Sequence, residues 1–122
     1  MFGRAPAVQQ LDAAFKRAGV PRGAIPDAVT LTAVRLLRES HGRAPSDAEA
    51  DAAAALLSYC VLGRDPVLAG HGAEAVETLE QRLDRAVTEG DSLDARLVLL
   101  ALHAGLLQES IRDRHGLTSA DA

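Results

Sequence analysis

Aromatic side chains are nearly absent from this chain, and their scarcity limits the folds that it can form. Only 2% of the 122 residues are aromatic, and tryptophan does not occur. A core must therefore be built from Leu, Val, Ile and Ala. That composition favours closely packed helices, because strands are enriched in aromatic and β-branched residues. We expect an all-α protein.

The length and composition indicate one folded domain over residues 1–122. Hydrophobic residues make up 48% of the chain and charged residues 25%, which is typical of a soluble globular protein. A chain of this size buries enough surface for one core and is too short for two. We expect residues 117–122 to form a frayed tail.

Apolar periodicity and helix-terminating residues predict a five-helix bundle. The expected helices cover residues 6–18, 27–40, 46–62, 73–89 and 93–115. Ser46 and Glu49 have the spacing of a capping box, and His41-Gly42 is typical of a helix C-terminus. Prolines and glycines predict that residues 64–72 stay out of regular structure.

The C-terminal helix is expected to be the most apolar of the five. Its leucines and alanines follow steps of three and four residues, and a second row of leucines lies beside the first. More than half of its circumference is then apolar, so it must be covered on two sides. Either it forms the centre of the bundle, or a second copy of the chain covers part of it as a homodimer.

Three polar residues interrupt this apolar helix at intervals of seven. Arg96, His103 and Ser110 would share one narrow stripe. The stripe is either the solvent-facing edge of the helix, the wall of a small cavity, or the polar part of a dimer interface. Alternatively, His103 is a core histidine that bonds to a backbone carbonyl. Tyr59 is expected at an interface, with its hydroxyl reaching solvent or a loop. Cys60 falls on a buried stripe, where cysteine acts as a small hydrophobic residue.

The sequence predicts no catalytic, metal or cofactor site. Two metal-binding spacings, Glu-x-x-His and His-x-x-x-His, do not occur. A nucleophile, a base and an orienting group cannot be paired from spacing alone. The Asp91-Ser92-Leu93 stretch resembles the Asp-Ser-Leu attachment site of acyl carrier proteins. A predicted helix runs almost to Gly90, however, where the carrier fold would have a long loop, so we interpret Asp91 or Ser92 as an ordinary helix cap.

Charge and the lone cysteine restrict the partners and the compartment. The net charge is −4 and the basic residues are scattered, which disfavours nucleic-acid binding. The longest apolar run is about half as long as the roughly 20 residues that a membrane span needs, so we expect no contact with a membrane. A single cysteine and the absence of a secretory signal favour the cytoplasm. Arginine in place of lysine, together with abundant alanine, is typical of a GC-rich bacterial genome.

These observations favour a small cytoplasmic helical protein without catalytic activity. We expect it to act through protein–protein contacts and to form a homodimer, because the C-terminal helix carries excess apolar surface. The alternative is a helical bundle that binds a small ligand in a pocket polarised by Arg96 and His103.

Overall fold

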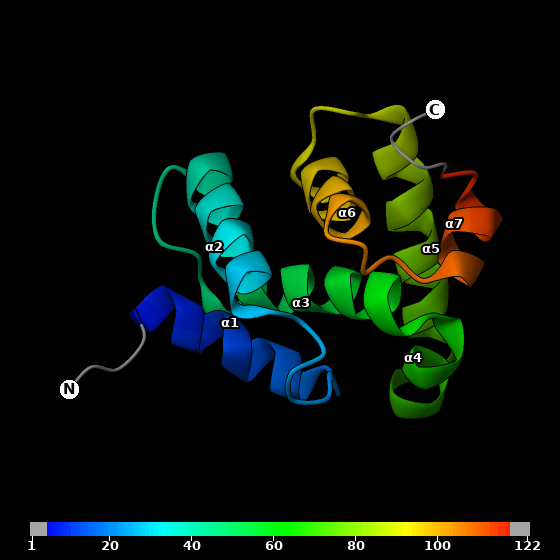
Figure 1. The fold of residues 1–122 in the computed structure, drawn as a ribbon, viewed down its shortest axis with the longest axis horizontal. Helices are drawn as coiled ribbons and strands as arrows, with labels where there is room; N and C mark the ends of the chain where they lie inside the picture. Colours follow the sequence, from blue (N-terminus) through cyan, green and yellow to red (C-terminus); the bar gives the residue numbers. More distant parts are fainter. Residues whose placement is uncertain (1–4, 118–122) are drawn as a thin grey trace.

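The structure is a computed structural model that describes residues 5–117, and every regular element in this range is a helix. The all-α prediction is therefore confirmed, but the predicted number of five helices is wrong. The helices are α1 (Pro6–Arg17), α2 (Asp27–His41), α3 (Asp47–Leu62), α4 (Arg64–His71), α5 (Ala73–Thr88), α6 (Leu93–His103) and α7 (Glu109–His115) (Figure 1).

The centre of the fold is α3, not the C-terminal segment. It packs against α1, α4, α5 and α6, and Figure 1 shows it running across the middle of the molecule. From Ala53 to Cys60 every residue except Ala55 is buried. Four consecutive alanines make the helix narrow, so that neighbours approach closely from several sides. The central position thus follows from small side chains around the whole helix rather than from a dense leucine row.

The predicted helix over residues 93–115 is divided in two. Gly105 adopts the left-handed conformation with φ of +73°, directly after Ala104, the C-cap of α6. The Leu106 N–H donates to the carbonyl of Ala101 at 2.9 Å, and the Gly105 N–H donates to that of Leu102 at 3.1 Å. This pattern is the Schellman ending of a helix. The prediction of one continuous helix was wrong because it relied on the leucine periodicity and did not treat Gly105 as the end of a helix.

The segment 64–72 contains a helix that the sequence interpretation excluded. Pro66 occupies the first turn of α4, where backbone N–H groups have no partner within the helix and a proline is tolerated. Gly63 and Gly72 flank the helix, each with φ of +92°. Val67 is buried against the core. These residues therefore limit the length of α4 rather than prevent it.

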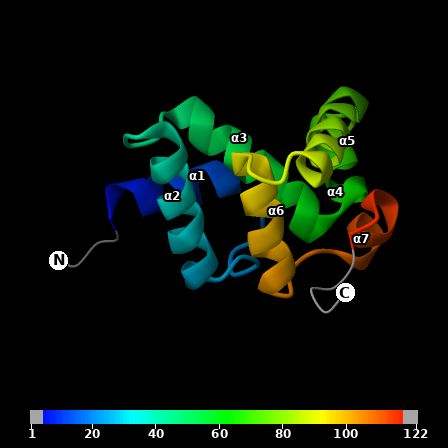
Figure 2. The ribbon, with the colours of Figure 1, turned by 90° about the horizontal axis from the view of Figure 1, so that it is seen from above.

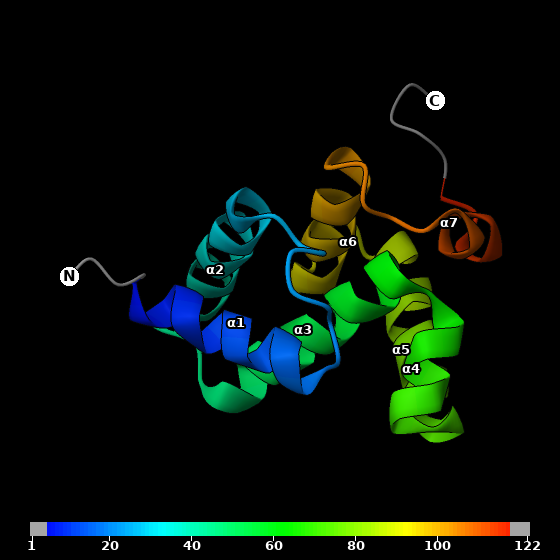
Figure 3. The same ribbon diagram turned by 60° about the horizontal axis from the view of Figure 1, so that its bottom comes forward.

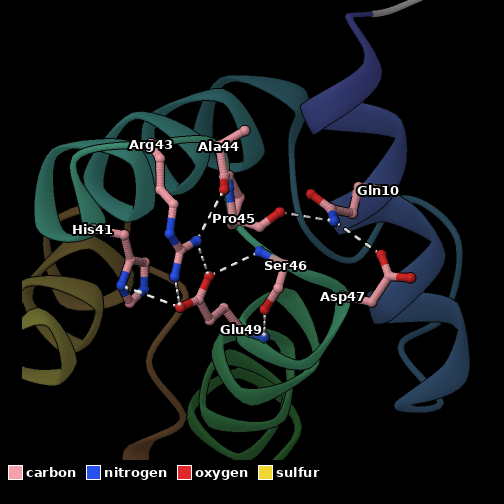
Figure 4. Close-up of polar contacts among 8 residues, drawn as sticks. All are labelled: Gln10, His41, Arg43, Ala44, Pro45, Ser46, Asp47 and Glu49. Carbon is pink, nitrogen blue, oxygen red and sulfur yellow. Dashed lines mark hydrogen bonds and ion pairs between the residues drawn. The ribbon is translucent and has the colours of Figure 1, made fainter.

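The predicted ends of α2 and α3 are confirmed at one polar junction (Figure 4). Gly42 ends α2 in the left-handed conformation after His41, and both bonds of the Ser46–Glu49 capping box are present. The Arg43 guanidinium donates to both carboxylate oxygens of Glu49 at 2.8 Å. Hydrogen bonds from Arg43, and then from the Ser46 N–H, lower the pKa of Glu49 to about 2.

Side chains near both ends of α1 connect it to α3. The Gln10 amide donates to the carbonyl of Pro45 at 3.0 Å and to the Asp47 carboxylate at 2.9 Å (Figure 4). At the other end, Arg17 pairs with Asp51 at 2.7 Å. Figure 3 shows α1 running along α3 toward α4. These contacts position the first helix against the central one.

Candidate functional site

The structure places the three predicted stripe residues on two helices. Arg96 and His103 are exposed on α6, whereas Ser110 is exposed on α7 and lies 3.4 Å from the Gln108 side chain. The turn at Gly105 therefore interrupts the stripe before it reaches Ser110. Neither Arg96 nor His103 lines any of four cavities found between residues 5 and 117.

The outward face of α6 has an apolar residue between two basic ones. Leu99 lies three residues after Arg96 and four before His103, which puts all three on one side of the helix. All three side chains are exposed, and the Leu99 residue is 43% exposed. The opposite side packs into the core through Leu97, Val98 and Ala101. Figure 2 shows α6 lying between α2 and α5, so much of the leucine row is covered within the chain.

Two other large apolar residues are also exposed. Leu31 on α2 is 51% exposed and Val87 on α5 is 45% exposed. Val87 is exposed because Ala86 takes the buried position at the end of α5. Single apolar residues on a surface are ordinary. Leu31 and Val87 lie on the two helices that flank α6, the helix that carries the exposed Leu99.

Tyr59 belongs to a buried hydrogen-bonded network that the sequence did not indicate. Its side chain is completely buried, so the expectation that its hydroxyl reaches solvent or a loop was wrong. The hydroxyl lies 2.9 Å from Nε2 of His115, and Nδ1 of His115 lies 2.7 Å from a carboxylate oxygen of Asp84. The network thus joins α3, α5 and α7 through one histidine ring.

This hydroxyl–imidazole–carboxylate order is chemically suited to activating a nucleophile, but its surroundings do not suit that role. Burial, and then the negative charge of Glu80, raise the pKa of Tyr59 to about 12. The phenolate is therefore disfavoured, and the buried hydroxyl is out of reach of a substrate. Glu80 also pairs with Arg114 at 2.7 Å, which adds an ion pair between α5 and α7. We interpret the network as a structural connection that holds α7.

Cys60 is fully buried, as predicted for a small hydrophobic residue. Burial raises the pKa of its thiol to about 12, so the thiolate needed for nucleophilic chemistry is disfavoured. The Cys60 carbonyl accepts a hydrogen bond from the Gln108 N–H at 2.8 Å, which anchors the segment between α6 and α7. Among the described residues, no group of three or more His, Cys, Asp or Glu side chains is placed to hold a metal ion.

Of the two residues predicted as possible helix caps, Asp91 and Ser92, the structure shows Ser92 as the cap. Its Oγ accepts a hydrogen bond from the Ala95 N–H at 3.1 Å at the start of α6. The chain matches no known protein family, no curated protein and no solved structure. Within residues 5–117, no helix combines the length and the apolar character that a membrane span requires.

Proposed function

We propose that the protein is a small helical module without catalytic activity that acts through protein–protein contacts, the first of which is self-association. The observation that supports this proposal is the exposed Leu99 between Arg96 and His103 on the outward face of α6. Burying an exposed leucine gains about 25 cal/mol for each Å² of apolar surface removed from water. A two-fold contact between two α6 helices would bury Leu99 in both copies at once.

The contact must extend beyond α6 to be stable. Specific interfaces bury at least about 1,000 Å² in total, which is more than one short helix provides. Leu31 on the neighbouring α2 supplies further exposed apolar surface. Arg96 and His103 would then lie at the polar edge of the contact, where charges influence orientation more than affinity. The lone buried Cys60 supports a reducing compartment, and we propose the cytoplasm.

The mass of the protein in solution tests this proposal. We expect light scattering after size-exclusion chromatography to show a concentration-dependent increase from the monomer mass toward twice that value. Leu99→Gln should lower the fraction of dimer, because glutamine has a similar helix propensity but removes the apolar contact. Val87→Gln is the matched control, since Val87 is equally exposed but lies on α5. A monomer at every concentration, or equal effects of the two variants, would contradict the proposal.

A further inference from the structure

A second region of the molecule, to which α6 contributes no residue, contains an apolar cavity. Its volume is about 280 Å³, and it lies between α1, α3, α4 and α5. Figure 3 shows the arrangement in which α1 runs along α3 toward α4. Most of its wall consists of small or aliphatic side chains: Ala14, Ala18, Ala55, Val67, Ala75 and Leu79. The abundance of alanine in the wall explains why the four helices leave space between them.

Ser58 introduces a polar group into this apolar wall. The residue is only 2% exposed, and its Oγ has no hydrogen-bond partner among the described residues. Buried hydroxyl groups in folded proteins are normally hydrogen-bonded, because an unpaired one carries a desolvation penalty. A helical serine usually bonds to the carbonyl four residues earlier, which here belongs to Ala54. Since that bond is not formed, the Ser58 hydroxyl has an unused hydrogen bond in a residue that lines the cavity.

The other polar side chains of the wall already have partners. Arg17 and Asp51 pair with each other at 2.7 Å, and about half of each side chain is exposed. Nε2 of His71 lies 3.1 Å from the Ala18 carbonyl oxygen, which connects the end of α4 to the end of α1. The paired charges of Arg17 and Asp51 cancel, so the cavity does not select for a charged ligand.

We propose that this cavity binds a small, neutral, largely apolar molecule that carries one hydrogen-bonding group, and that this group pairs with Ser58 Oγ. A dry apolar cavity of about 150 Å³ is sufficient for benzene. The present volume is nearly twice as large and suits two fused rings. An adjoining hollow of about 450 Å³ shares both Ser58 and His71 and can receive a longer substituent. The site is independent of the self-association proposed for α6.

Indole and indene form a matched pair of probes, because they have the same two-ring shape but only indole has an N–H donor. The chain contains no tryptophan, so the fluorescence of added indole, excited at a wavelength that tyrosine does not absorb, reports binding without an indole background from the protein. We expect both probes to shift amide resonances around the cavity in NMR titrations of the full chain. Indole should bind roughly three- to tenfold more tightly than indene, the value of one hydrogen bond.

Three variants identify the site. Ser58→Ala should abolish the preference for indole and raise the Tm of the ligand-free protein, because the unpaired hydroxyl is removed. Ala75→Leu should fill the cavity and weaken the binding of both probes. Ala48→Leu is its matched control: both alanines lie in the first turn of a helix, but Ala48 is exposed and does not line the cavity.

Several results would overturn the proposal. One is that neither probe shifts resonances of the cavity wall, or that the shifts map elsewhere. Another is that Ala75→Leu binds the probes as well as Ala48→Leu does. A preference for indole that survives in Ser58→Ala would also contradict it, as would a lower Tm in that variant, which would show that the hydroxyl already has a partner within the chain.

Discussion

Replacing Tyr59 by phenylalanine tests the role of the buried network most directly. The substitution removes the 2.9 Å bond to His115 but retains the ring that fills the core. It leaves Nε2 of His115, whose side chain is 2% exposed, without this partner. An unsatisfied buried polar group costs about 1–3 kcal/mol. For 122 residues the unfolding entropy is about 0.26 kcal/mol/K, so the Tm should fall by about 4–12 °C.

The other bond of the same histidine provides the comparison. Asp84 is 70% exposed, and an asparagine at that position can still accept a hydrogen bond from Nδ1. Because water can also reach the Asp84 position and the asparagine keeps the bond, Asp84→Asn should change stability by less than Tyr59→Phe. Urea unfolding monitored by circular dichroism measures both free energies. If Tyr59→Phe stays within about 0.5 kcal/mol of the parent protein, or if Asp84→Asn costs as much, the structural role of the network is refuted.

Three further predictions concern the backbone and the pH dependence of stability. Gly105→Ala should destabilise the protein by about 1 kcal/mol in urea unfolding because it forces alanine to a positive φ, whereas Gly90→Ala, which has no such conformation, should not. The pKa values of Tyr59 and Cys60 are raised to about 12, so their contribution to stability should be full below about pH 9 and decrease toward pH 12. Unfolding curves recorded over a series of pH values measure this contribution, and stability that does not decrease would contradict the prediction. The pKa of Glu49 is lowered to about 2, so its contribution to the free energy of unfolding is present above pH 4.5 and lost toward pH 2. Glu49→Gln should therefore make this free energy less dependent on pH in the acid range. An unchanged pH dependence in this variant would contradict the prediction.

Local capping signals allowed much of the fold to be predicted from the sequence. The Ser46–Glu49 capping box, the Ser92 cap and the His41-Gly42 ending occur where the sequence indicated them. The signals that failed were ambiguous ones. Gly105 lies within a leucine-rich pattern that predicts a continuous helix. A proline ends a helix at most positions but is tolerated in the first turn, which is where Pro66 lies in α4.

The sites were much less predictable, because they depend on contacts between distant segments. The His115 ring meets Tyr59 across a separation of 56 residues, and no spacing rule connects them. The sequence indicated His115 only as the last residue of the predicted helix over 93–115, and it is the last residue of α7. Whether Ser58 finds a partner depends on the packing of four helices around it. The predicted polar stripe does not include Ser110 because the turn at Gly105 ends α6 before that residue.

The division at Gly105 makes the last helix a dependent element. An isolated helix as short as α7 is not stable in water, so its order derives from docking through Ile111, His115 and the bond from the Gln108 N–H to the Cys60 carbonyl. Release of these few contacts would free the segment while the rest of the bundle stays folded. In native-state hydrogen exchange, the amides of α7 should therefore exchange through a subglobal opening, well before those of α3. That partly open form would free the Tyr59 hydroxyl, which bonds to His115 when α7 is docked.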